Sequence, residues 1–398
     1  MTTSDPPTPR RISIFDTTLR DGEQAPRNAM TAEQKLDLAL RLQTLGADVI
    51  EAGFPASSPT DFRAARLIAR NLTTAQVATF CRATRADVEV AVEAAGTQNH
   101  QIQVLATGSE IHLEHKRGIT RETALRELRD TVDFALSLGV RHVSVAVEDA
   151  TRGSRDLLAD TVATSLEAGA ECVAIGDTTG CATPQEFGNL IAAVRNWVPA
   201  PRKVSVHCHN DFGLALANTV AGIEAGADEV QVTLGGIGER AGNTALEEVV
   251  ALLAYKSDQV GAYTDVKTEA LHDAYSALRR AIGLEEPRNK AIVGAFAFAT
   301  AAGIHQQGIL QNPTTYEYVR PARFGRQTSL LVARHSGRAI VRHVLSEAGL
   351  VMDEATVTAL FETYVNGRAG GDCVELDVLR EEIFDALALT AADALSAR

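Results

Sequence analysis

The feature that most constrains this chain is a repeated alternation between short β-branched runs and longer helical stretches. Between the runs, apolar residues recur at helical spacing, and several helical stretches end in glycine, as at Gly139 and Gly226. A glycine just before a strand is typical of the turn that closes a βα unit. The eight runs cover residues 11–15, 48–52, 76–80, 101–106, 142–147, 172–175, 203–206 and 229–234. Eight such units predict an α/β fold, a closed (β/α)8 TIM barrel, rather than an open sheet.

The pattern divides the chain into three expected parts. Residues 1–10 are rich in Pro and Thr and are predicted to be a disordered tail. Residues 11–270 hold the repeated pattern and form the TIM-barrel catalytic domain. Residues 271–398 combine a long linker with helical patterns near 337–348 and 353–364, so they predict a mainly α-helical C-terminal appendage. A linker of that length without regular structure is usually functional or disordered.

Charge and composition exclude several classes of partner. The net charge is −13, which argues against nucleic acid and membrane surfaces, since both attract basic proteins. The sequence shows no apolar run long enough to span a bilayer and no secretory h-region at its start. Five cysteines, an odd count without close pairing, indicate reduced thiols and a cytoplasmic location.

Two histidines at the end of the seventh predicted strand indicate a metal site. The active site of a TIM barrel lies at the carboxyl ends of its strands, and residues two apart on a strand point to the same side. His207 and His209 therefore can bind one ion, and Asp16 at the end of the first strand would complete a two-histidine, one-carboxylate set. Mg²⁺, Mn²⁺ and Zn²⁺ all fit these ligands. Two structural histidines in a polar turn are the alternative.

An arginine and a glycine-rich turn indicate where anionic groups bind. Arg20 follows the first strand, and its guanidinium suits bidentate binding of a substrate carboxylate beside the metal. A solvated helix position is the alternative for Arg20. The turn after the eighth strand lies where barrels often bind phosphates, and a simple tight turn is its alternative. That turn contains Gly236, Gly238, Glu239 and Arg240.

Five motifs of this chain resemble those of the 2-isopropylmalate synthase and homocitrate synthase family, within the DRE-TIM metallolyases. They are DTTLRDGEQ at residues 16–24, EAGFPASSP at 51–59, HCHNDFGLA at 207–215, GIGERAGN at 236–243, and NKAIVG at 289–294 leading to GIHQ at 303–306. The resemblance extends from about residue 11 to residue 338. It is closest to 2-isopropylmalate synthases, because Arg20 is followed by Asp21 where homocitrate synthases often carry Glu.

The resemblance implies a Claisen-type condensation of acetyl-CoA with a 2-oxo acid, followed by thioester hydrolysis. The metal ligands it implies are Asp16, His207, His209 and, close by, Asn243. The 2-oxo acid would contact Arg20, Asp21, Gln24, Gln103 and Thr178. The catalytic groups would be Arg20, Glu148, His305 and Tyr316, and part of acetyl-CoA would bind at Gly236, Gly238, Glu239 and Arg240. In the family the positions of His305 and Tyr316 reach into the partner subunit's barrel, which implies a homodimer with exchanged C-terminal elements.

Three positions depart from the family pattern. Gln103 stands where His is usual, Gly235 where Asn is usual, and Gln307 where Asp is usual. The first two lie near the predicted site, where the change from His to Gln alters the hydrogen-bond donors. The acceptor therefore stays open between 2-oxoisovalerate or a relative, the acceptors of homocitrate and citramalate synthases, and an unusual acid such as phosphonopyruvate. A lyase of the hydroxymethylglutaryl-CoA type is the alternative from another class.

Overall fold

The computed structural model describes residues 8–396, with side chains up to residue 388. It forms two compact units, Met1–Glu285 and Glu286–Arg398, so the first unit extends past the expected barrel end at residue 270. Most of the predicted tail, residues 1–7, lies outside the described residues. Arg10 is not part of a tail, because β1 (Arg10–Arg11) pairs in parallel with β10 (Ala262–Tyr263). No described helix is long and apolar enough to cross a membrane.

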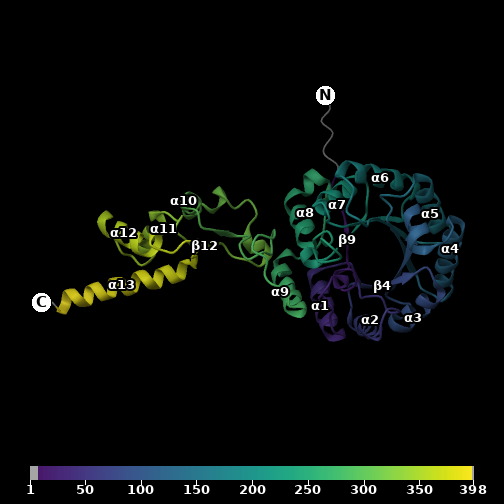
Figure 1. Ribbon diagram of the computed structural model, residues 1–398, viewed down its shortest axis with the longest axis horizontal. Helices are drawn as coiled ribbons and strands as arrows, with labels where there is room; N and C mark the ends of the chain where they lie inside the picture. Colours follow the sequence, from purple (N-terminus) through teal and green to yellow (C-terminus); the bar gives the residue numbers. More distant parts are fainter. Residues whose placement is uncertain (1–7, 397–398) are drawn as a thin grey trace, which may run out of the picture. The chain divides into compact units, whose positions relative to one another are not determined.

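The first unit is a closed barrel of eight parallel strands (Figure 1), as the eight β-branched runs predict. The last strand pairs with the first, from Ser13 opposite Glu229 to Asp16 opposite Val232, and this pairing closes the ring. The strands are β2 (Ser13–Asp16), β3 (Val49–Glu51), β4 (Gln76–Arg82), β5 (His100–Thr107), β6 (His142–Glu148), β7 (Cys172–Asp177), β8 (Lys203–Cys208) and β9 (Glu229–Val232).

Helices surround the barrel strands (Figure 1), each placed after its strand. Their starts are set by capping residues: Thr31 accepts a hydrogen bond from Gln34 N, and Gln34 caps Thr31 in return. The helices are α1 (Ala32–Leu45), α2 (Pro59–Asn71), α3 (Arg85–Ala95), α4 (Arg121–Ser137), α5 (Arg155–Glu167), α6 (Pro184–Trp197), α7 (Ala215–Glu224), α8 (Leu246–Val260) and α9 (Leu271–Ile282).

Strand alternation decides which residues face the barrel interior. Phe15, Val49 and Ala78 form one buried cluster from three neighbouring strands, and Phe15 is the register partner of Val49. These positions face inward. Because alternate residues point to opposite faces, Asp16 faces outward, toward the layer of helices.

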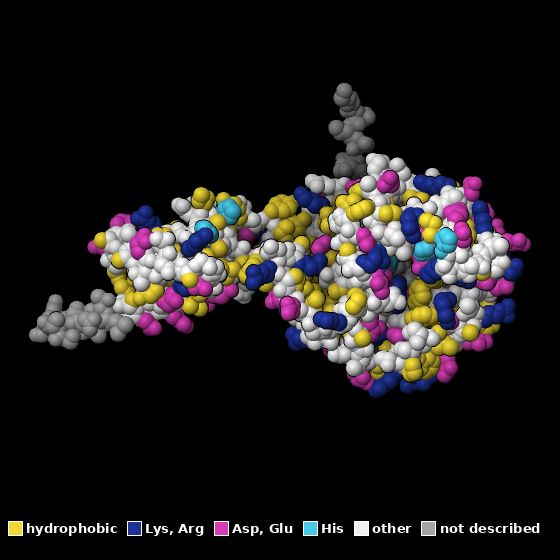
Figure 2. All heavy atoms as spheres, viewed as in Figure 1, with side chains coloured by type: hydrophobic (Ala, Val, Ile, Leu, Met, Phe, Trp, Pro, Cys, Tyr) yellow, Lys and Arg dark blue, Asp and Glu magenta, His cyan; other side chains and the backbone are white. Residues whose placement is uncertain are grey.

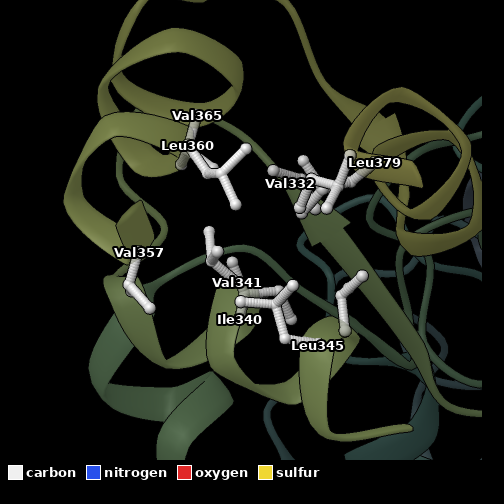
Figure 3. Packing of buried hydrophobic residues seen from close by; sticks show 10 residues of the cluster. Val332, Ile340, Val341, Leu345, Val357, Leu360, Val365 and Leu379 are labelled. Carbon is white, nitrogen blue, oxygen red and sulfur yellow. The ribbon is translucent and has the colours of Figure 1, made fainter. Parts of the chain in front are cut away.

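The second unit has its own core, in agreement with the expected helical appendage. Its elements are α10 (Gly303–Gln311), α11 (Arg338–Glu347), α12 (Glu354–Phe361) and α13 (Leu376–Ser396), with the short strands β11 (Ala299–Thr300), β12 (Ser329–Val332) and β13 (Val374–Glu375). Figure 3 shows aliphatic side chains of this core turned toward one another, among them Val332, Ile340, Leu345 and Leu360. A self-contained cluster of this kind supports a separate folding unit.

Charged side chains are mixed on the surface of the first unit. On the face that Figure 2 shows, lysines and arginines alternate with aspartates and glutamates. Mixed charges produce only a weak field at a distance, so the anion-binding groups of interest are the local ones inside the barrel mouth.

Candidate active site

A cavity of about 610 Å³ opens at the carboxyl ends of the barrel strands. Its position follows the rule for TIM barrels, since its lining comes from strand ends and the segments that follow them. The sequence-predicted residues that line it are Arg20, Asp21, Gln24, Glu148, Thr178, His207, His209, Glu239 and Arg240.

Three ligand-type side chains converge at this cavity. The Nε2 atoms of His207 and His209 lie 3.3 Å apart, and Asp21 Oδ2 lies 3.0 Å from the first and 3.7 Å from the second. Burial lowers the pKa of His209 to about 4, helped by the neighbouring His207. Burial alone would raise the pKa of Asp21, but Arg20 and His207 hold it well below its ordinary value. A neutral imidazole and an ionised carboxylate are the forms that bind a metal.

Asn243 is the fourth member of this group. Its Nδ2 lies 3.2 Å from both Asp21 Oδ2 and His207 Nε2, and it forms a β-bridge with His209. Gly238 makes this approach possible, because a Cβ at Gly238 would lie 1.8 Å from Asn243 Oδ1. That oxygen is buried and has no hydrogen-bond partner among the described residues. A divalent cation bound by Asp21 and His207 would reach that oxygen only with the amide rotated, because Nδ2 is the atom that faces them. Asp21 and the two histidines fit a metal without it.

Asp16, the carboxylate expected from the sequence, is not part of the group. It is fully buried, and its Oδ1 accepts a hydrogen bond of 2.9 Å from Thr18 N. Burial raises its pKa to about 7, and Glu247 of α8 adds to the rise. The physical reason is the alternation of the strand, which turns Asp16 outward, whereas Asp21 comes from the turn that follows β2 and reaches the cavity.

Arg20 is held against the cavity wall by a carboxylate and a ring. Its Nε donates to Glu51 Oε2 at 2.7 Å, and its guanidinium lies 4.9 Å from the centroid of the Phe80 ring. The side chain is 11% exposed. Glu51 was not among the residues predicted for the site, although it ends β3.

A series of hydrogen bonds links His207, one of the two histidines of the candidate metal site, to Arg20. His207 Nδ1 lies 3.0 Å from Gln231 Oε1, Gln231 Nε2 donates to Gln103 Oε1 at 2.7 Å, and Gln103 Nε2 donates to Glu51 Oε1 at 3.0 Å. With Nδ1 as donor, the free lone pair of His207 is on Nε2, where the other ligand atoms lie. The sequence predicted Gln103 as a substrate contact. The structure instead places its amide inside this buried chain, and Gln231 was missed.

Glu148 lies at the other side of the cavity with two basic neighbours. Lys116 Nζ donates to Oε2 and Oε1 of Glu148 at 2.6 and 2.7 Å, and His112 Nδ1 lies 3.2 Å from Oε2. Both come from the turn after β5, a π-helix spanning His112–Arg117. In the sequence, only the position of this segment after a barrel strand signals a role at the site.

The turn after β9 forms part of the cavity rim. Arg240 donates from Nε and Nη2 to the two carboxylate oxygens of Asp211, each at 2.8 Å, and from Nη2 to Thr178 O at 2.7 Å. Thr178 Oγ1 accepts a hydrogen bond of 2.9 Å from Asp149 N. Gly236 adopts φ +66° in the same turn.

His305 and Tyr316 lie together in the second unit. Their ring centroids are 4.3 Å apart, and both side chains are exposed, Tyr316 by 50%. His305 is in the first turn of α10, and Tyr316 follows a short 3-10 helix, Pro313–Thr315. Their predicted catalytic role stays a prediction.

The comparisons with known proteins agree with these features. A family model described as HMGL-like matches residues 11–278, and one described as homocitrate synthase post-HMGL domain-like matches residues 292–368. The chain is 43% identical over 356 residues to the 2-isopropylmalate synthase of Syntrophus aciditrophicus, covering 88% of this chain and 69% of that protein. It is 42% identical over 346 residues to the probable 2-isopropylmalate synthase of Methanopyrus kandleri, covering 87% and 68%.

Solved structures show a likeness in the barrel. The HMG-CoA lyase of Bacillus subtilis superimposes with a TM-score of 0.61 at 22% identity, covering 70% of this chain and 95% of that one. The lyase of Pseudomonas aeruginosa gives a TM-score of 0.60 at 24% identity, covering 70% and 94%. At these identities the likeness concerns the fold.

Proposed function

The chain belongs to the 2-isopropylmalate synthase family, and on that premise we propose that it condenses acetyl-CoA with a 2-oxo acid. The acceptor would be 2-oxoisovalerate or a relative with an apolar side chain, and hydrolysis of the thioester would follow. The observation that carries the proposal is the convergence of Asp21, His207 and His209 beside Arg20 in one cavity. A cation and a guanidinium side by side suit the keto and carboxylate oxygens of a 2-oxo acid.

We propose Asp21, His207 and His209 as the metal ligands, with Asn243 as a fourth or nearby ligand. Asp21 replaces Asp16 in this set because it contacts both histidines, whereas Asp16 faces away from the cavity. A bound Mg²⁺, Mn²⁺ or Zn²⁺ would supply Lewis-acid polarisation of the keto group. The hydrogen bonds from His207 through Gln231 to Gln103 fix the tautomer of His207. This role is typical of groups around metal-bound histidines.

Arg20 is proposed to hold the carboxylate of the 2-oxo acid. Glu51 accepts a hydrogen bond from its Nε atom, and Nη1 lies 3.5 Å from Asp21 Oδ2 without a hydrogen bond between them, so Nη1 and Nη2 can donate to a substrate carboxylate in a bidentate arrangement. Thr178 lines the cavity opposite and is proposed as a further contact. As the new carbon–carbon bond forms, negative charge develops on the former keto oxygen, and Arg20 beside it stabilises that charge.

The proton on the acetyl methyl group needs a positioned base, because a thioester is a weak carbon acid. We propose that Glu148, held by Lys116 and His112, takes part in this step with His305 and Tyr316 of a second copy of the chain. The exposed contact between His305 and Tyr316 supports a shared role. This proposal requires a homodimer in which each copy contributes its His305 and Tyr316 to the barrel of the other.

Acetyl-CoA is proposed to enter from the cavity mouth, where the turn from Gly236 to Arg240 forms the rim. Glu239 and Arg240 line the cavity, and a glycine-rich turn at this place in a barrel suits phosphate groups. Gly236 and Gly238 would let the backbone approach the ligand closely.

The test is a thiol-release assay with purified protein, Mg²⁺ or Mn²⁺, acetyl-CoA and a panel of 2-oxo acids. The proposal predicts release of free CoA thiol only when both the metal and an acceptor are present. Matched reactions without an acceptor, and with EDTA, serve as controls. Absence of release with every acceptor and metal would contradict the synthase proposal.

A further inference from the structure

The floor of the active-site cavity is made of apolar residues from three neighbouring strands, two of them alanines. Leu105 of β5 is the register partner of Ala146 of β6, and Ala146 is the partner of Ala174 of β7. All three line the cavity. Leu105 and Ala146 lie inside the barrel yet stay partly exposed, so the cavity extends down to this row.

The depth of this floor follows from the strand register. Gly176 of β7 pairs with His207 of β8, and the strands of a TIM barrel are staggered by about one residue from each strand to the next. Ala146, on the alternate strand β6, therefore lies level with His207, and Ala174 of β7 lies about one residue, roughly 3.3 Å, lower. The floor thus lies beside and just beneath the metal group, and Gly176 adds no side chain above Ala174.

The open volume can be expressed in carbon atoms. Inward rows of TIM barrels are usually filled by Val, Ile or Leu, whereas this row has alanine at two of three neighbouring strands. Replacing Val or Leu by Ala at two positions leaves space for about four to six carbons. An isopropyl group has three carbons, an isobutyl group four and a phenyl ring six.

The floor offers apolar contact but no free charge. The amide of Gln103 is already bonded to Gln231 and Glu51. The basic residues that line the cavity nearer its rim are each paired with a carboxylate: Arg82 with Asp87, Lys116 with Glu148, Arg117 with Glu127, and Arg240 with Asp211. A second carboxylate or phosphonate that reached the floor would find no charge partner there, and an unpaired buried charge is costly.

The proposed function fixes which part of the acceptor reaches this floor. Its carboxylate and keto oxygens are assigned to Arg20 and the metal group, and acetyl-CoA is too large to enter except from the mouth. The floor is left for the side chain of the 2-oxo acid. Resting on the proposed function, we propose that the acceptor carries an apolar side chain larger than isopropyl, branched or aromatic, of about four to six carbons.

The direct test compares acceptors by kcat/KM for thiol release, with the intact protein and saturating acetyl-CoA. We expect 4-methyl-2-oxopentanoate, whose isobutyl side chain has four carbons, to exceed 2-oxoisovalerate and pyruvate by at least about tenfold, since each well-buried methylene contributes roughly that much to discrimination. The acidic acceptors 2-oxoglutarate and phosphonopyruvate should be poorer still. A preference for pyruvate, 2-oxoisovalerate or an acidic acceptor would overturn this inference while leaving the synthase proposal intact. Failure of every acceptor would instead contradict the synthase proposal.

Filling the floor should reverse the preference. Ala174→Leu and the milder Ala146→Val are expected to lower kcat/KM for the larger acceptors at least about tenfold while largely keeping use of 2-oxoisovalerate. Retained turnover of the smaller acceptor shows that the variants are folded. Ala163→Leu, on the exposed side of α5, is the matched control and should change neither value. An equal loss for all acceptors in folded variants, or no loss for the larger ones, would overturn the assignment of the floor to the acceptor side chain.

Discussion

Two aspartates of the same motif, five residues apart in the sequence, have different surroundings. Asp21 contacts both histidines of the candidate metal site, whereas Asp16 is fully buried and bonds to the backbone of Thr18. From the motif we predicted Asp16 as the metal ligand and Asp21 as a contact of the 2-oxo acid, whereas the structure brings Asp21 to the histidines. Which aspartate reaches the histidines depends on the turn after β2, where strand alternation no longer predicts the direction of a side chain.

The two aspartates give a matched test of the metal site. Asp21→Asn is expected to lower metal affinity at least about tenfold and turnover with it, because a charged ligand becomes a neutral amide. Asp16→Asn should keep the metal. Metal content after dialysis and thiol release measure both effects. If Asp16→Asn lost the metal while Asp21→Asn kept it, the ligand set proposed here would be incorrect.

Arg20 should act on the acceptor and not on the metal. Arg20→Ala removes the proposed carboxylate partner, so we expect kcat/KM for the 2-oxo acid to fall more than tenfold. This corresponds to a loss of about 2 kcal/mol or more in transition-state stabilisation. Metal content should stay at the level of the unchanged protein. Arg66→Ala, an exposed arginine of α2, is the control. Unchanged kinetics for the 2-oxo acid would contradict the clamp.

At the scale of elements, the sequence predicted the barrel well and the site only in part. The eight strands follow from their β-branched runs, because buried parallel strands need such runs. Contacts between distant strand ends were not visible in the sequence. The chain from His207 to Glu51 depends on Gln231 and Gln103, which lie far apart in sequence and meet only because β9 and β5 share one barrel. The basic turn after β5 was missed for the same reason.

The junction of β4 and β5 contains a titratable group that should couple stability to pH. His100 Nε2 lies 2.7 Å from Thr79 Oγ1, and Nδ1 lies 2.7 Å from Gly96 O. Burial lowers the pKa of His100 to about 4 from an ordinary value of 6.5. As the pH falls, His100 is therefore protonated at a higher pH in the unfolded chain than in the folded protein. Its neutral form contributes fully to the free energy of unfolding above pH 6.5, and this contribution is lost as the pH falls toward 4.

Replacing His100 should remove this dependence. Between pH 7 and pH 4.5 we expect the unfolding free energy of the unchanged protein to fall by roughly 2–3 kcal/mol more than that of His100→Asn. Urea unfolding at the two pH values measures the difference. His115→Asn, whose side chain is 71% exposed, should behave like the unchanged protein. Equal losses in His100→Asn and the unchanged protein would rule out His100 as the cause.

At the scale of the whole molecule, the proposed homodimer makes a prediction about mixed subunits. If each site combines a barrel with His305 and Tyr316 from a second copy, then His207→Ala and His305→Ala are each inactive alone but complement each other. Random mixing produces half mixed dimers with one intact site each, so about a quarter of the full activity should return. Thiol release after unfolding and refolding the mixed variants measures it. If no activity returns although mixed dimers form, each site is built within one chain.

The proposed reaction forms a carbon–carbon bond between acetyl-CoA and a 2-oxo acid. It is tested most directly by supplying acetyl-CoA labelled with ¹³C at the methyl carbon, with a divalent metal and the preferred acceptor, and following the label by NMR. We expect the label to appear in the CH2 group of a 2-substituted malate, in amounts equal to the CoA released. Label recovered only as acetate would show thioester hydrolysis without condensation and would contradict the proposed reaction.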